Sequence, residues 1–309
     1  LGSLSAEQRQ FVDVARAAAA AQGGPGTKLG DLRRRIGPPA AGGVAEEVWR
    51  SIAAAVAANG GLEPAKLGFA RTDRLALKHL SKRYEALAAV LAGFGMEHVE
   101  LHVSEQRAGV ARAITREQPI VCLGADVAQA ATPATRFLLG RALASTIAGI
   151  GVAADLRDEE IVVCFAAAIK VAEVAAPASG PLGEILARAG DPRLVDERAR
   201  ALAKQMSRRD RKTLAGVLGG DGASHLGDPL IWRRGAVAFV NRVGLLLAGD
   251  LATSLDILDL GRGGRSLVDS PIGLDIVAWA VGAAHLELRR ELGLTPSPSP
   301  AVGGFGRHA

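Results

Sequence analysis

The sequence has few aromatic residues, few cysteines and no long apolar run, and each shortage narrows the structures that the chain can form. Aromatic residues make up 4% of the 309 residues, so the apolar volume comes mostly from smaller side chains, Ala, Leu and Val. Its two cysteines, Cys122 and Cys164, lie in apolar runs, which favours buried free thiols in a reducing compartment over a disulfide. The stretch 142–154 has no charged residue but is shorter than the roughly 20 residues of a membrane-spanning helix.

Basic and acidic residues are interspersed along the chain, so the pattern of charge does not indicate the class of binding partner. The chain has 37 Lys and Arg against 32 Asp and Glu, a net charge of +5 and a pI of about 9.6. The densest basic run, 208–212, is interrupted by Asp210 and has no aromatic residue beside it, which favours a solvated helix end. Binding of nucleic acid or another anionic partner through this run and 262–265 is kept as an alternative, which predicts a steep dependence on salt.

The two ends of the chain predict different things. The first residues, LGSLSAEQRQ, lack the basic and apolar regions of a signal peptide, and the chain begins with Leu rather than Met. The last residues, 295–309, are rich in Pro, Ser and Gly, which predicts a disordered tail. We therefore expect a cytoplasmic segment of a longer protein, with no membrane span.

The apolar residues that are present predict a mainly α (α+β) fold. They are mostly Ala, Leu and Val, and Ala and Leu are among the best helix formers. Because the periodicity changes after Gly95, we expect an N-terminal helical region over 1–95, a second domain over 96–294 and the tail. Apolar spacing, capping residues and Gly stops predict helices over 4–22, 31–36, 44–58, 71–93, 134–149, 157–175, 180–189, 194–218, 228–248, 250–258 and 272–292.

One region alternates in the manner of a β-strand. In HVELHVS (98–104), two valines and a leucine alternate with polar residues, which is typical of a half-buried strand. The runs 109–115 and 119–123 are two further short strands, and the first of them is expected to pair with 98–104 through a turn. We expect a small antiparallel sheet near 98–123.

Common catalytic motifs are missing from the sequence. There is no phosphate-binding GxxxxGK[ST] loop and no G-x-S-x-G nucleophile elbow. GRGGRS at 261–266 has no strand before it, which favours an exposed linker over a phosphate site. Ser224 and His225 are adjacent in a glycine-rich segment and are best explained as part of a polar loop.

Six histidines are spread along the chain and form no recognisable metal motif. His98 and His102 flank Glu100, but residues four apart on a strand lie about 13 Å apart, whereas zinc needs ligand nitrogens at about 2 Å. A polar outer strand face is therefore favoured over a metal site. A hydrolase that uses these three residues, with a metal, stays open as an alternative. His79 and His285 stand alone on predicted helices, which favours packing or surface roles.

The order of elements after residue 98 resembles that of a known peptidase family. Strand-like runs lead to P-x-[IV]-x-x-G (119–124), then to a helix with RFLLGRALAS (136–145), and much later to WRRGAVAFVNRVGLLLAGD (232–250). This arrangement is similar to the soluble relatives of HtpX and the CAAX prenyl proteases, the zincin (minigluzincin) metallopeptidases. In that family a hairpin precedes a helix with G-H-E-x-G-H, and a later helix carries a glutamate. Similar domains follow tetratricopeptide repeats in bacterial proteins.

When the family's motif is matched residue by residue, the resemblance implies a site that has lost its metal ligands and its catalytic glutamate. Arg141 stands where the family has its first histidine, Ala142 where it has the catalytic glutamate, and Ser145 where it has the second histidine. The third ligand falls near Val237, four residues before Asn241, where the family usually has an aspartate. Arg cannot deprotonate to ligate a metal, and Val and Ala side chains have no donor atom.

The resemblance thus implies a degenerate zincin-like domain over 96–294, with no catalytic residue, no metal and no other cofactor. We expect a non-catalytic pseudopeptidase that acts as a protein–protein interaction or scaffold module, whose partner is another protein or the rest of a longer chain. The simpler alternative for 134–149 is a buried helix of small residues, in which Arg141 needs a carboxylate or an exit to solvent. The scaffold positions that match the family are Gly140, Leu143, Arg242 and Gly244.

Overall fold

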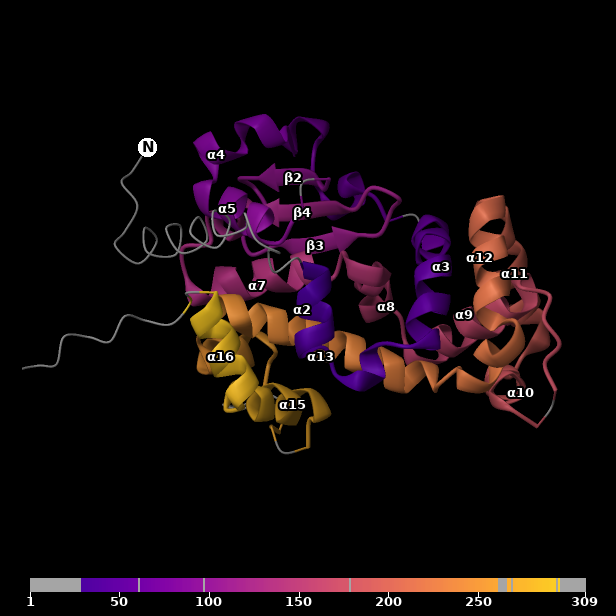
Figure 1. Ribbon diagram of the computed structural model, residues 1–309. Helices are drawn as coiled ribbons and strands as arrows, with labels where there is room; N and C mark the ends of the chain where they lie inside the picture. Colours follow the sequence, from indigo (N-terminus) through magenta and orange to yellow (C-terminus); the bar gives the residue numbers. More distant parts are fainter. Residues whose placement is uncertain are drawn as a thin grey trace, which may run out of the picture.

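The structure is a computed structural model, and it describes residues 29–294 except 61, 97, 178, 261–265, 268 and 293. The helix predicted over 4–22, the basic stretch 262–265 and the predicted tail therefore lie outside the described residues. Most of the described residues are helical, and one small sheet lies on one side of the helices (Figure 1). The predicted mainly α (α+β) class is confirmed.

The helices of the described residues follow the predicted pattern over most of the chain. Asp228 and Asp250 each accept a backbone N–H from the first turn of the helix that follows. Gly249, at φ 69°, ends the helix between them in the left-handed conformation that glycine adopts freely. The bounds are α2 (Leu29–Ile36), α3 (Val44–Gly60), α4 (Leu80–Arg83), α5 (Glu85–Gly93), α6 (Ala125–Gln129), α7 (Pro133–Ala144), α8 (Ile150–Asp155), α9 (Asp158–Val171), α10 (Pro181–Arg188), α11 (Pro192–Gln205), α12 (Arg208–Leu218), α13 (Pro229–Ala248), α14 (Leu251–Ile257), α15 (Pro271–Ala280) and α16 (Ala283–Glu291).

The segment predicted as one helix over 71–93 is the main error in the helical pattern. It contains short 3-10 turns, the two-residue strand β1 (Arg74–Leu75), α4 and α5. The backbone groups of β1 pair with the strand that follows α5, so they cannot also form the hydrogen bonds of a helix. Tyr84, at φ −138°, separates α4 from α5.

Two other predicted helices are split at capping residues. Within 194–218, the Ser207 hydroxyl accepts from Asp210 N at 3.1 Å, and the Asp210 carboxylate accepts from Ser207 N at 3.3 Å. This capping box starts α12 and ends the continuity with α11. Within 272–292 the chain turns at Gly282, between α15 and α16.

The sheet is mixed, with the strand order β1-β2-β4-β3. β2 (Glu100–Ser104) runs parallel to β4 (Ile120–Gly124), whereas β1 is antiparallel to β2, and β3 (Ala111–Ile114) is antiparallel to β4. The expected direct pairing of β2 with β3 in an antiparallel sheet is therefore wrong. β4 takes the central place because it is the most apolar strand and is buried along its length, whereas the exposed Arg112 suits β3 to an edge.

The second face of the sheet is covered, which the sequence pattern did not predict. His102 and Ser104 are only 6% and 4% exposed, so the expected polar outer face of β2 is wrong. The cover comes from the segment before β1, where Phe69 packs on Ile114 and Cys122. The opposite face of the sheet joins the main hydrophobic core.

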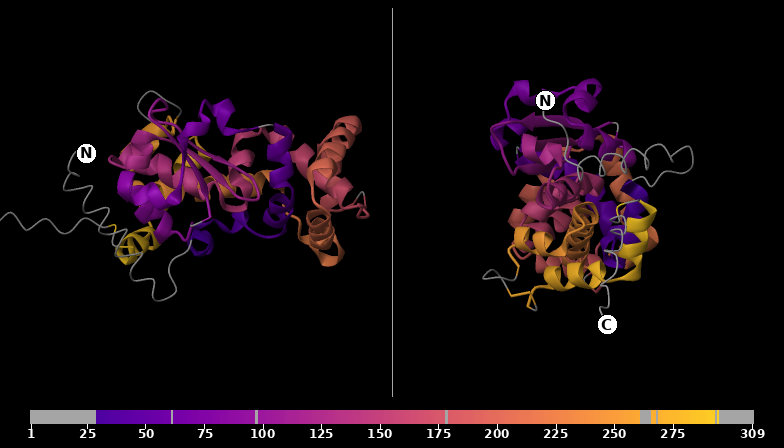
Figure 2. Two further views of the ribbon diagram at one scale, coloured as in Figure 1. Left: turned by 90° about the horizontal axis from the view of Figure 1, so that it is seen from above. Right: turned by 90° about the vertical axis from the view of Figure 1, so that its left-hand side faces the viewer.

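The main core contains residues from both sides of the domain boundary predicted at 95. Trp49 of α3 stacks on Phe165 of α9 with ring centres 5.9 Å apart and lies 5.2 Å from Trp232 of α13. All three side chains are at most 1% exposed. The helices α11 and α12 lie at one end of the molecule and α16 lies at the other (Figure 2). The division of the chain at 95 stays a prediction.

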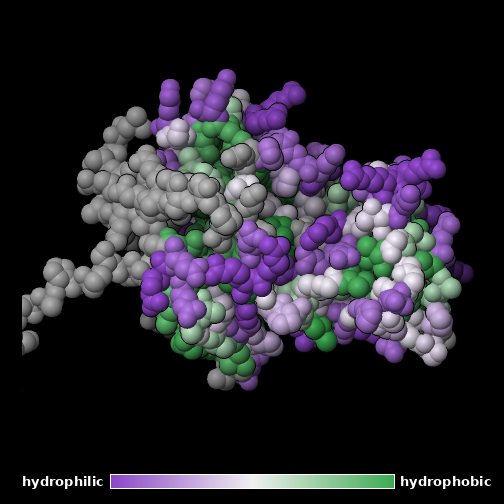
Figure 3. All heavy atoms as spheres, in the orientation of Figure 1, coloured by the Kyte–Doolittle hydropathy of each residue, from purple (hydrophilic) through white to green (hydrophobic). Residues whose placement is uncertain are grey.

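Helices α15 and α16 and the turn between them carry three exposed large apolar side chains. Leu274, Val281 and Leu286 are 50%, 73% and 51% exposed, and Figure 3 shows hydrophobic side chains at the lower left, where these helices lie. No single helix in the described part of the chain has the length and apolarity that a membrane crossing requires. Taken together, α15 and α16 pass that test of length and composition, with a bend of 59° between them.

Helices α7 and α13 cross with their backbones in contact, and this crossing positions the candidate site. A Cβ added to Gly140 would lie 2.8 Å from Val243 O and 2.9 Å from Gly244 Cα. A Cβ added to Gly244 would lie 2.8 Å from the Phe137 ring. Only glycine fits these separations, so two of the scaffold positions matched in the sequence hold the helices together.

Candidate functional site

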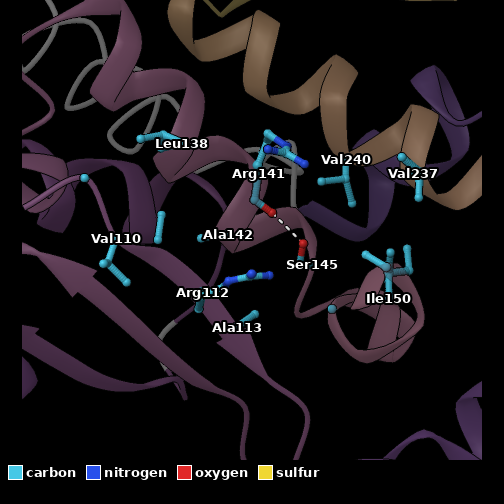
Figure 4. Close-up of a pocket in the computed structure, with 14 residues that line it drawn as sticks. Val110, Arg112, Ala113, Leu138, Arg141, Ala142, Ser145, Ile150, Val237 and Val240 are labelled. Carbon is cyan, nitrogen blue, oxygen red and sulfur yellow. Dashed lines mark hydrogen bonds between the residues drawn. The ribbon is translucent and has the colours of Figure 1, made fainter. Parts of the chain in front are cut away.

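A pocket of about 420 Å³ lies between the edge strand β3 and the helices α7, α8 and α13 (Figure 4). All four positions singled out in the sequence line it: Arg141, Ala142, Ser145 and Val237. The pocket thus joins two helices that are far apart in the sequence. Its complete lining is Gly109, Val110, Ala111, Arg112, Ala113, Leu138, Arg141, Ala142, Ser145, Ile150, Gly151, Ala154, Val237 and Val240.

Helical spacing explains how α7 and α13 supply two of the walls. α7 starts at Pro133 after Thr132, whose hydroxyl accepts from Thr135 N at 3.2 Å. Val237 and Val240 are three residues apart on α13 and therefore share a face. The pocket residues of α7 also share one face, at positions i, i+3, i+4 and i+7: Leu138, Arg141, Ala142 and Ser145.

The side chains at the four predicted positions do not fit a zinc ion. Ala142 and Val237 have no donor atom, and the guanidinium of Arg141 donates hydrogen bonds but has no lone pair for a metal. Ser145 Oγ donates a hydrogen bond to Arg141 O at 2.8 Å (Figure 4). Within the described residues, no group of three His, Cys, Asp or Glu side chains could hold a metal ion.

Arg141 brings an unbalanced positive charge to the pocket. Its Nε is buried without a hydrogen-bond partner, and its guanidinium forms no ion pair with any other described residue. Its Cζ lies 5.7 Å from the centre of the Phe137 ring. Burial lowers the pKa of Arg141, Arg112 lowers it further, and Asp155 acts in the opposite direction. Because a guanidinium keeps its proton in proteins, the charge remains.

The second cation of the pocket is already paired. Arg112 of β3 donates to Asp155 Oδ1 at 2.7 Å, and the two side chains are 54% and 44% exposed. Figure 4 shows the two arginines entering from different elements, Arg141 from α7 and Arg112 from β3. The pair of Arg112 and Asp155 is neutral, so the three groups together carry one net positive charge.

Asn241 and Arg242 of α13 support the scaffold and do not line the pocket. Asn241 is 1% exposed, and neither its Oδ1 nor its Nδ2 has a partner among the described residues. Arg242 pairs with Asp275 through two hydrogen bonds and donates to Ile36 O at 2.7 Å. Arg242 therefore ties α13 to α15 and α2.

The alternative site around Glu100 is a structural ion-pair cluster. His102 Nε2 lies 2.8 Å from Glu100 Oε1, and Arg74 Nη2 lies 2.9 Å from Glu100 Oε2. His98 is exposed before β2 begins, whereas His102 is 6% exposed within the sheet. The two histidines do not face one site, and the metal-dependent hydrolase stays a prediction.

The remaining candidates have structural explanations. Ser224 Oγ donates to Asp221 O at 2.7 Å, within a 3-10 turn. The basic run 208–212 is exposed in the first turns of α12, as predicted for a solvated helix end. Cys122 and Cys164 are free and buried, and burial raises their pKa to about 12 and about 11, which leaves them protonated and unreactive.

The sequence pattern did not predict the two pocket walls that β3 and α8 form. A strand was predicted over 109–115, but it was expected to pair with β2, so the edge that lines the pocket was not foreseen. The helix predicted over 134–149 ends at Ala144, and the chain then turns so that Ile150 and Gly151 close the pocket. The charge of Arg112 in a strand of small and apolar residues is the signal that could have indicated an edge.

Comparisons with known proteins give no match: no protein-family model, curated protein or solved structure is significantly similar to the chain. The resemblance to the zincin metallopeptidases therefore rests on the residue pattern and the order of elements. Membership of that family, a bacterial source and an association with tetratricopeptide repeats stay predictions.

Proposed function

We propose that the chain is a non-catalytic protein-interaction module, a degenerate zincin-like domain whose pocket binds an extended segment of a protein partner. The observation that carries the proposal is the convergence of four residues that were chosen by motif position alone. Arg141, Ala142, Ser145 and Val237 line one pocket. Metallopeptidase chemistry needs a metal to activate water and a general base beside it, and these side chains supply neither.

The edge strand β3 gives the pocket a means of binding an extended segment. Among the described residues, β3 is the last strand of the sheet, so one of its edges has no strand partner there. Val110 O accepts from Gly124 N at 2.8 Å, and by the alternation of an antiparallel ladder Ala111 and Ala113 direct their backbone groups away from β4. At Ala113 this edge is covered by α8, because a Cβ added to Gly151 would lie 3.1 Å from Ala113 O, so the open part of the edge is the one that includes Ala111. A segment of another protein can pair with such an edge by adding a strand to the sheet.

The pocket beside this edge supplies specificity. Residues 109–113 line the pocket, so a strand added to β3 runs along its rim. Side chains alternate between the two faces of a strand. At least one side chain of the added segment therefore faces α7 and α13, and its size and charge decide which segment binds.

Selection from a library of short random peptides tests the proposal, with wild type and Ala111→Pro as baits. Proline at 111 removes an N–H from the free edge and leaves the hydrogen bonds to β4 in place. Peptides enriched by the wild type are expected to bind Ala111→Pro at least about tenfold more weakly, a loss of about 1.4 kcal/mol. Ala111→Ser keeps the N–H and serves as the matched control.

The proposal is wrong if no peptide is enriched or if Ala111→Pro binds the enriched peptides as the wild type does. Peptide hydrolysis by the purified chain that a chelator abolishes would also contradict it. Binding by wild type and Ala111→Ser, with loss in Ala111→Pro, supports it.

A further inference from the structure

Arg141 differs from Arg33 and Arg289 in having no oxygen atom to pair with among the described residues. Arg33 donates to Glu46 Oε2 at 2.8 Å, and Arg289 donates to Leu246 O at 2.7 Å. Among the described residues, the Phe137 ring lies against the guanidinium of Arg141, and Asp155 attracts the guanidinium without forming an ion pair with it. The Nε of Arg141 is buried without a partner, while the side chain as a whole is half-buried in the wall of the pocket, so its charge is open to a ligand of opposite sign.

The position of Arg141 makes such a ligand accessible. The residue lines the pocket of about 420 Å³, which is lined by the edge of β3. Ala142, Ala154, Val237 and Val240 also line it, and their apolar side chains suit the methylene groups of an incoming side chain. The polar end of that side chain then meets the guanidinium.

The charge of the pocket favours a carboxylate over a phosphate. Arg112 is neutralised by Asp155 at 2.7 Å, so one positive charge remains, on Arg141. A carboxylate carries a single negative charge and matches it, whereas a phosphate group carries nearly two at neutral pH. The planar guanidinium also matches the two oxygens of a carboxylate in a bidentate contact.

We infer that the pocket binds a carboxylate through Arg141, and that this carboxylate is an Asp or Glu side chain of the extended segment paired with β3. The peptide part of the inference rests on the proposed function. The anion site itself rests on Arg141 and the pocket, so the two can fail separately.

The test repeats the peptide selection with wild type, Arg141→Met and Arg141→Lys as baits. The wild type is expected to enrich Asp or Glu at a single peptide position, and Arg141→Met is expected to enrich neutral residues there. Exchange of that Glu for Gln in a synthetic peptide should weaken binding to the wild type about tenfold, as expected for a charged hydrogen bond, and leave binding to Arg141→Met unchanged. Arg141→Lys keeps the charge but loses the planar fork, so its preference should fall between the two.

Two controls separate binding from folding. Arg209→Met removes an exposed arginine of α12, outside the pocket, and should behave as the wild type. Arg141→Met should keep the near-ultraviolet circular dichroism spectrum of the wild type, because a methionine of similar length fills the same space between α7 and α13.

Propionate, a small free carboxylate, is the second probe, followed through the side-chain Nε resonance of Arg141. Equal binding of the Glu and Gln peptides by the wild type overturns the inference and leaves the proposed function standing. A saturable response to propionate without any peptide binding supports the anion site and overturns the proposed function. No response to propionate and no acidic preference overturn the carboxylate site altogether.

Discussion

Arg33 on α2, which is buried, and Arg141 on α7, which is half-buried in the wall of the pocket, have similar neighbours and one decisive difference. The Cζ of Arg33 lies 4.8 Å from the ring centre of Phe239, and that of Arg141 lies 5.7 Å from the ring centre of Phe137. In both, Nε lacks a hydrogen-bond partner and burial lowers the pKa. Only Arg33 has a carboxylate, because its Nη2 lies 2.8 Å from Glu46 Oε2.

This difference separates a structural arginine from a binding arginine. The pair of Arg33 and Glu46 joins α2 to α3, and its charges are balanced within the fold. Arg141 faces a pocket, and no carboxylate of the described residues pairs with its charge, so a ligand supplies the counter-charge. Folds retain groups that reduce stability mainly where function needs them. The comparison therefore locates the site without reference to any resemblance.

The largest expected effect comes from making Arg33 resemble Arg141. Glu46→Leu removes both acceptor oxygens and leaves the Arg33 guanidinium buried and unpaired, which should lower the free energy of unfolding by about 3–5 kcal/mol. Urea denaturation measures the change. Arg50→Gln removes the other, 62% exposed partner of Glu46 and should cost no more than about 1 kcal/mol. Equal costs for the two variants would contradict the structural role assigned to the buried pair.

The next effect tests the helix crossing that holds the Arg141 pocket. Gly140→Ala places a Cβ 2.8 Å from Val243 O, so α7 and α13 must separate, at a cost of about 1–3 kcal/mol in unfolding free energy. Gly216→Ala on α12 meets nothing within 4 Å and should gain up to about 1 kcal/mol. Thermal or urea unfolding compares the two. A neutral Gly140→Ala would show that the helices are not held at contact distance.

In the third prediction, a substitution inside the protein raises the free energy of unfolding, whereas such substitutions usually lower it. Arg141→Met removes an unpaired charge and should raise the free energy of unfolding by about 1 kcal/mol. Arg33→Met breaks a buried pair and should lower it by about 3–5 kcal/mol. The same urea titration measures both. If Arg141→Met destabilises the protein as much as Arg33→Met, Arg141 has a structural partner and the comparison fails.

The fourth prediction makes Arg141 resemble Arg33. Val237→Glu places a carboxylate on α13 in the wall of the same pocket. The new pair should change unfolding free energy by less than about 1 kcal/mol, because desolvation offsets attraction, but it should abolish the response to propionate. Val237→Gln, of the same shape and without charge, is the control and should keep the response. Propionate binding by Val237→Glu would place the anion elsewhere.

The smallest effect concerns a buried base that stays neutral. His285 is 6% exposed, its Nδ1 lies 2.8 Å from Ala280 O, and burial lowers its pKa below 6.5. The unfolded chain therefore takes up a proton more readily, so the stability contributed by neutral His285 is present above the unfolded pKa and is lost as pH falls through about 6.5 and below. Urea midpoints between about pH 7.5 and about pH 5.5 should fall less in His285→Gln than in the wild type. An equal fall in both would assign the pH dependence to other groups.

Local signals predicted the parts of the fold that local interactions determine. The predicted break between helices 228–248 and 250–258 lies between α13 and α14, where Gly249 is left-handed and Asp250 Oδ1 accepts from Thr253 N at 2.9 Å. The spacing of Arg141, Ala142 and Ser145 placed them on one helix face, and they do line one pocket.

Tertiary contacts determine what the sequence pattern missed. β4 is inserted between β2 and β3 because it can be buried along its length, which no periodicity reveals. His102 looked like an outward polar residue, but the segment that carries Phe69 covers that face of the sheet. The helix predicted over 71–93 gave way to β1 because a neighbouring strand edge was available for pairing. Each of these three errors concerns a partner distant in the sequence, whereas the helix splits at Ser207 and Gly282 arise from local turns.

The side-chain Nε resonance of Arg141, followed while propionate and then zinc are added to separate samples, tests the central claim most directly. If the former metal positions now form an anion site, propionate shifts this resonance saturably and zinc leaves it unchanged. A resonance that ignores propionate, or that responds to zinc, would contradict the account.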